Sequence, residues 1–72
     1  KYKCIILFQV GEFYELFEKD AETIAPLIGL TLTRRNKNDL ESMKISGFPI
    51  NILYIYMPKI LQHGFKVVVC NQ

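Results

Sequence analysis

The stretch Gly11-Glu12-Phe13-Tyr14-Glu15-Leu16-Phe17 decides how this chain folds, because it joins two segments of different hydrophobic pattern. Before it, the run Cys4-Ile5-Ile6-Leu7-Phe8 is continuously apolar, which is typical of a strand buried on both faces. After the glycine, apolar residues recur at helical spacing. The sequence therefore predicts a strand from about Lys3 to Val10 and a helix from about Tyr14 to Ile28.

The remaining chain predicts three more strands and one more helix. Strands are expected over about Leu30 to Arg34, Met43 to Ser46 and Phe65 to Cys70, and a helix over about Ile50 to His63. The order βαββαβ predicts an α/β (α+β) fold in which helices cover a small mixed sheet, with the first and last strands both paired. Six side chains are expected in the core: Leu7, Phe17, Ile24, Leu32, Ile60 and Val68.

Length and composition limit the class of protein. Seventy-two residues allow a single domain, 1–72, which is marginal by itself and is expected to be a fragment of a larger protein. Half of the residues are hydrophobic and 22% are charged, which favours a packed core over disorder. No apolar run is long enough to span a membrane. The net charge of +2 permits contact with nucleic acid without arguing for it.

The two cysteines, Cys4 and Cys70, stand near opposite ends of the chain. They form no CxxC pair, and no His or Cys lies at metal-ligand spacing from them. We expect two buried thiols in strands of an intracellular protein. A disulfide is possible only if the first and last strands bring the two residues close together.

Phe13 has two interpretations. At a strand-to-helix junction it can project as a wedge toward a flat ligand, with Glu15 beside it. Residues two apart on a regular helix point about 200° away from each other, so this requires an extended segment or a helix that begins after Phe13. Alternatively, Phe13 is the first core residue of the helix and Glu15 favours the helix N-terminus by charge. Periodicity by itself favours the second interpretation.

Two charged clusters have a functional and a structural interpretation. Glu15, Glu18 and Glu22 would share a helical face, which suggests a metal or nuclease site. No second acidic element or catalytic His accompanies them, which favours a solvated face. The basic segment 34–38 contains Arg34, Arg35 and Lys37. It is either a solvated turn or a set of phosphate contacts.

The whole chain resembles the N-terminal mismatch-recognition domain of the MutS family of DNA mismatch repair proteins. The matching blocks are Leu7 to Phe17, Asp20-Ala21, Leu30 to Arg35, Gly47-Phe48-Pro49, and Gly64 with Val67, Val68, Cys70 and Gln72. The resemblance implies that Phe13 stacks on a mispaired or unpaired base from the minor groove and that Glu15 hydrogen-bonds this base. It also implies that Arg34, Arg35 and Lys37 lie near the DNA backbone.

Further implications follow from the same resemblance. The domain would be a non-catalytic binder of double-stranded DNA with mismatches or small loops, with no cofactor of its own, in an intracellular protein. ATP and Mg would belong to a separate ATPase domain of a homodimeric or heterodimeric parent. The alternative is a structural or protein-interaction module without mismatch binding. Four departures from the family pattern concern the backbone contacts more than the wedge: Gln9, Asn51, Asn71 and the glycine-free loop 36–42.

Overall fold

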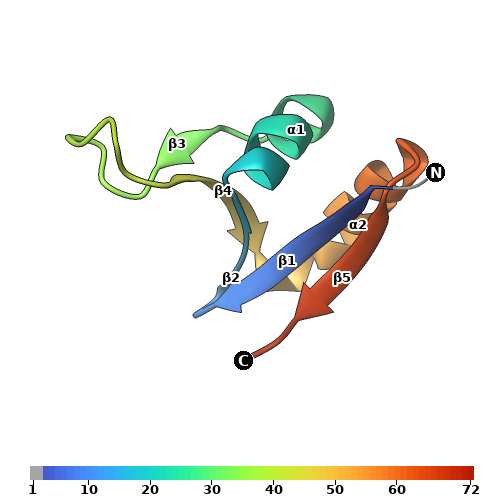
Figure 1. Cartoon of the computed structure of the whole chain (residues 1–72). Helices are drawn as coiled ribbons and strands as arrows, with labels where there is room; N and C mark the ends of the chain where they lie inside the picture. The colour runs from blue at the N-terminus through green and yellow to red at the C-terminus, as the bar shows by residue number, and fades with distance from the viewer. Residues whose placement is uncertain (1–2) are drawn as a thin grey trace.

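The computed structural model describes residues 3–72, which form a five-stranded mixed sheet and two α-helices (Figure 1). The elements in chain order are β1 (Cys4–Val10), β2 (Phe13–Phe17), α1 (Lys19–Ile28), β3 (Thr33–Arg34), β4 (Lys44–Pro49), the 3₁₀ turn η1 (Ile50–Ile52), α2 (Leu53–Gln62) and β5 (Lys66–Cys70). The predicted fold class is confirmed. The order of elements has one strand more than the sequence pattern predicts.

That additional strand is β2, so the predicted helix start at Tyr14 is wrong. Gly11, with φ +60°, and Glu12 form a two-residue turn, and β2 returns antiparallel to β1 with Val10 opposite Phe13. β2 also pairs with β4 on its other side. The aromatic residues of β2 have high strand propensity, and pairing on both edges satisfies its backbone. The helix therefore begins only at Lys19.

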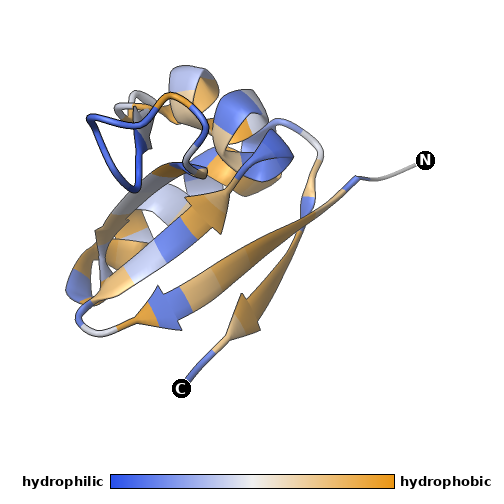
Figure 2. Cartoon of the chain, turned by 60° about the vertical axis from the view of Figure 1, so that its left-hand side comes forward, coloured by the Kyte–Doolittle hydropathy of each residue, from blue (hydrophilic) through white to orange (hydrophobic). Residues whose placement is uncertain are grey.

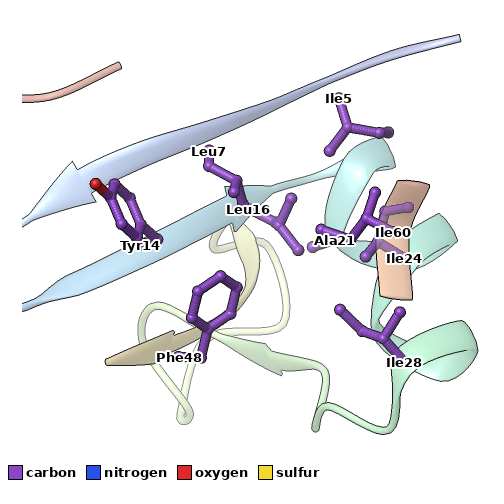
Figure 3. Close-up of a cluster of buried hydrophobic side chains, with 9 residues drawn as sticks. All are labelled: Ile5, Leu7, Tyr14, Leu16, Ala21, Ile24, Ile28, Phe48 and Ile60. Carbon is purple, nitrogen blue, oxygen red and sulfur yellow. The ribbon is translucent and has the colours of Figure 1, made fainter. Parts of the chain in front are cut away.

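The strand order is β3-β4-β2-β1-β5, with β1 and β5 parallel and the other pairs antiparallel. The two helices pack against the same face of this sheet. Buried side chains from β1, β2, β4 and both helices meet there and form the core shown in Figure 3. The cluster consists of Ile5, Leu7, Tyr14, Leu16, Ala21, Ile24, Ile28, Phe48 and Ile60.

The opposite face of the sheet has no helix on it within residues 3–72, which corrects two expectations. β1 is not buried on both faces, because only alternate residues, Ile5 and Leu7, are fully enclosed. Val68 was expected in the core but is 45% exposed on the uncovered face. Leu32, in the connection before β3, is also exposed, and Phe17 is half-buried, whereas the expected burial of Leu7, Ile24 and Ile60 is confirmed.

Both cysteines are exposed, so the expectation of buried thiols is wrong. They lie on neighbouring strands, but Cys4 is opposite Lys66 and Cys70 is opposite Phe8. An offset of four positions corresponds to about 13 Å along a strand, beyond the roughly 7 Å that a disulfide allows between Cα atoms. The thiols are free.

The acidic residues of the α1 region anchor the helix to the sheet. The Asp20 carboxylate accepts a hydrogen bond of 3.1 Å from the backbone N–H of Ile6 in β1. Glu22 forms an ion pair with Lys44 of β4, and the hydrogen bond from this lysine holds the pKa of the Glu22 carboxyl below its usual range. Because Glu15 lies in β2, no shared helical face forms, and within residues 3–72 no group of acidic residues, His and Cys is placed to hold a metal.

Candidate functional site

Phe13 lies at the tip of the β1–β2 hairpin, directly after the turn. Its side chain is 46% exposed, so it is not a core residue, and the strand neighbours of its backbone are Val10 and Pro49. The interpretation in which Phe13 packs inward at a helix start is therefore wrong. An aromatic ring at the end of a hairpin can reach beyond the body of the domain, as a wedge must.

Glu15 lies on the same face of the sheet as Phe13, because side chains two apart in a strand point to the same side. On a regular helix the two side chains would point about 200° apart, whereas on this strand they can face one ligand. Glu15 is opposite Gly47 of β4, and a Cβ added at this glycine would lie 3.3 Å from Glu15 Cγ. The Glu15 side chain therefore occupies space that any residue other than glycine would restrict. In the sequence, Gly47 stands out only as part of the matching block Gly47-Phe48-Pro49.

The uncovered face around Glu15 exposes the apolar side chains of Phe8, Val10 and Val68. Figure 2 shows that β1 and β5 are hydrophobic along most of their length. Phe8 is opposite Glu15 on β1, and its ring meets that of Phe17 at 5.4 Å between centroids. Exposure by itself does not distinguish Phe13, since Phe8 at 38% and Val68 at 45% are similar. What distinguishes Phe13 is its place at the hairpin tip.

Of the three basic candidates, Arg34 stabilises the loop by a hydrogen bond, whereas Arg35 and Lys37 extend into solvent. Arg34 Nη1 donates a 2.8 Å hydrogen bond to the Ser42 carbonyl oxygen, so this guanidinium closes the β3–β4 loop. Arg35 and Lys37 are exposed, and their side chains form no hydrogen bond or ion pair within residues 3–72. Within this loop the Ser42 Oγ lies 2.8 and 2.7 Å from the Asn36 and Asp39 carbonyl oxygens, which share its single proton as acceptors.

Phe13 and the basic loop lie at opposite ends of β4. Phe13 is opposite Pro49, whereas Arg34 is opposite Lys44, five positions away. At about 3.4 Å per residue, the separation along the strand is about 17 Å. This is the length of about five base pairs of duplex DNA, so the two features can contact one duplex only at separate points.

A group of polar contacts that no sequence pattern predicts lies behind the hairpin tip. The buried Tyr14 donates a 2.8 Å hydrogen bond from its hydroxyl to Asn71 Oδ1, across a separation of 57 residues. The backbone N–H of Gln72 donates to Gln9 Oε1 at 3.2 Å. The segment after β5 thus touches both strands of the hairpin. In the sequence, these contacts were indicated only by Gln9 and Asn71, which both depart from the MutS family pattern.

Comparison with known proteins identifies relatives over the whole chain. The family described as MutS domain I matches residues 1–72. A DNA mismatch repair protein MutS from Salinibacter ruber is 43% identical over 97% of this chain, and one from Desulfosudis oleivorans is 41% identical over 96%. A third, from Rickettsia prowazekii, is 39% identical over 96%. In each case the chain spans only 8% of the length of the relative.

Proposed function

This chain belongs to the MutS domain I family, and from this we propose that it recognises mispaired or unpaired bases in duplex DNA by inserting Phe13 from the minor groove. The observation that carries the proposal is the half-exposed Phe13 ring at the hairpin tip, with Glu15 on the same face. The three relatives described above are named as DNA mismatch repair proteins, which supports the choice of ligand.

The energetics of base stacking explain why an aromatic wedge selects mismatches. Inserting a side chain unstacks a base step and kinks the duplex, which costs a few kcal/mol, and the cost is lowest where pairing is already poor. The Phe13 ring replaces part of the lost stacking, a contact worth about 1–3 kcal/mol. The domain therefore reads the deformability of the step more than its sequence.

Glu15 adds discrimination. A carboxylate near phosphates is electrostatically unfavourable, so it weakens binding to any duplex that offers it no hydrogen-bond donor. A displaced base offers such a donor. The space above Gly47 leaves the Glu15 side chain room beside the wedge.

Replacing Glu15 tests the proposal directly. In the full-length protein, Glu15→Ala should raise affinity for matched duplex DNA and lower the ratio of mismatch to match affinity, because it removes a repulsive charge that only a displaced base satisfies. The measurement is a titration of duplexes that differ by a single mispair. Glu41→Ala is the control, because Glu41 is an exposed carboxylate in the loop 35–43, at the other end of the sheet. Its removal should raise matched and mismatched affinity about equally and leave their ratio unchanged. An unchanged ratio in Glu15→Ala contradicts the role given to Glu15.

The basic loop should contribute sequence-independent affinity. The double variant Arg35→Ala/Lys37→Ala should weaken matched and mismatched DNA about equally and reduce the slope of log K against log salt by about two, one for each phosphate that the variant no longer neutralises. Lys59→Ala removes a cation from the exposed surface of α2, where its Nζ lies 5.3 Å from the Tyr56 ring, and should leave the slope unchanged. An unchanged slope in the loop variant favours a solvated turn.

We assign this chain the role of one domain in a longer, homodimeric or heterodimeric protein that works inside the cell with DNA. Neither α1 nor α2, the helices within residues 3–72, is long and apolar enough to cross a bilayer. We assign no catalysis and no cofactor to this domain. ATP and Mg²⁺ belong to a separate ATPase domain, in keeping with the family resemblance.

A second candidate function is supported by the uncovered apolar face. Phe8, Val10 and Val68 expose between 38% and 45% of their surface on one side of the sheet, which is typical of a surface that another protein segment covers. In this alternative the domain is a structural or protein-interaction module. Loss of mismatch preference on replacement of Phe13 argues against it, since a module of this kind has no preference for mismatched DNA to lose.

A further inference from the structure

The position of Phe13 is fixed through its backbone. Its half-exposed ring takes part in none of the close aromatic contacts within residues 3–72. The position of the ring therefore depends on how rigidly the backbone of the hairpin tip is held. A wedge must enter the duplex at a defined place, because displacing a positioned group by about 1 Å strongly reduces its function. The contacts of the residues beside Phe13 are therefore part of the recognition device.

Tyr14, the next residue, points to the other face of β2 and is firmly enclosed. Its ring lies 6.1 Å from that of Phe48 in β4, and Phe48 stacks on Tyr56 of α2 at 4.8 Å. Figure 3 shows the Tyr14 hydroxyl at the end of the ring remote from Phe48. There it donates its hydrogen bond to Asn71, beyond the end of β5. Packing thus fixes the ring, and one hydrogen bond fixes its outer end.

The turn itself is held from both sides. The backbone N–H of Ile50, at the start of η1, donates to the Glu12 carbonyl at 2.9 Å. On the side of β5, Gln72 N donates to Gln9 Oε1, and Gln9 Nε2 in turn donates to the Gly11 carbonyl at 3.4 Å. The Gln9 contacts are exposed to water, whereas the Tyr14–Asn71 hydrogen bond is partly buried and therefore exchanges less readily with solvent.

From these contacts we infer that Tyr14 is a positioning residue for mismatch recognition: its hydroxyl, bound to Asn71, fixes the strand that carries Phe13 against the segment that leaves β5. The inference rests on the proposed function of Phe13. Tyr14 does not touch DNA, because it is buried on the helix-covered face. Its hydroxyl acts through the backbone of β2, so that Phe13 meets the base step in one orientation.

The test removes the hydroxyl and keeps the ring. In the full-length protein, Tyr14→Phe should lower mismatch affinity about threefold to tenfold, the range expected for one hydrogen bond, and change matched affinity by less than about twofold. Asn71→Ala should do the same, and the double variant should be no worse than either single one, because all three remove one interaction. Asn71→Asp keeps an acceptor and should retain the ratio of mismatch to match affinity.

Tyr56→Phe is the matched control. Tyr56 belongs to the same aromatic stack, but its hydroxyl has no hydrogen-bond partner within residues 3–72, so the ratio should not change. The positioning role is overturned if Tyr14→Phe leaves the ratio unchanged, if the effects of the two single variants simply add, or if matched and mismatched affinity fall together with loss of the folded domain.

The Phe13→Ala variant distinguishes a failure of the Tyr14 positioning role from a failure of the proposed function of Phe13. Mismatch preference that survives Phe13→Ala refutes the proposed function, and the positioning role with it. Preference that is lost in Phe13→Ala but kept in both Tyr14→Phe and Asn71→Ala refutes the positioning role alone.

Discussion

Phe13→Ala is expected to abolish the preference of the full-length protein for mismatched over matched DNA while leaving this domain folded. A stacked base–aromatic contact is worth about 1–3 kcal/mol, so the ratio of mismatch to match affinity should fall about 5- to 150-fold. Matched DNA, whose paired steps resist insertion, should bind almost as before. The measurement is a pair of titrations on duplexes of identical sequence apart from one base.

The structural side of this prediction follows from exposure. Truncating a fully buried phenylalanine costs about 3–5 kcal/mol, whereas the Phe13 side chain is 46% exposed and should cost well below that range. Thermal unfolding of the variant domain checks it. Phe8→Ala is the matched control, since Phe8 is a 38% exposed phenylalanine on the same face but away from the tip, and it should retain mismatch preference. A Phe13 variant that unfolds, or that still prefers mismatches, contradicts the wedge.

Gly47→Ala is expected to have the largest effect on stability among the glycine replacements. A Cβ at this position would lie 2.5 Å from the Tyr14 carbonyl oxygen and 3.3 Å from Glu15 Cα, and both are backbone atoms that cannot turn aside. β2 and β4 must move apart to admit it. Overpacking of this kind costs about 1–3 kcal/mol, which in a domain of this size corresponds to a fall in melting temperature of at least about 4 °C.

Gly64→Ala is the control for Gly47→Ala, because it replaces a glycine without the steric clash that an added Cβ causes at Gly47. Gly64 has φ +86°, but an added Cβ there meets nothing within 4 Å, so its cost is confined to the left-handed backbone, about 1–2 kcal/mol. Gly47→Ala should also reduce mismatch preference in the protein that remains folded, because the strand it displaces carries Phe13 and Glu15. If Gly47→Ala is no more destabilising than Gly64→Ala and keeps the preference, the close approach of β4 to β2 has no importance for the site.

The segment Phe13–Phe17 shows where local pattern misleads. Its residues fit the helical spacing that continues through Ile24 and Ile28, and they also fit a strand, with Tyr14 and Leu16 on one face. Five residues are too few for periodicity to decide between the two. Tertiary pairing selects the strand, since β2 pairs with β1 and β4 on its two edges. Glu18, with φ 49°, then interrupts the regular backbone between β2 and the start of α1.

The sequence by itself determined the fold class, the two helices with glycines at or just beyond their ends, and the family to which the chain belongs, because local propensity, turn residues and motif spacing all lie along the chain. Only the tertiary structure decided which face of the sheet is covered, and hence that Val68 is exposed and Tyr14 buried. It also decided that Arg34 closes a loop and that Phe13 shares a face with Glu15. These facts depend on strand register and on partners distant in sequence, which no local pattern specifies.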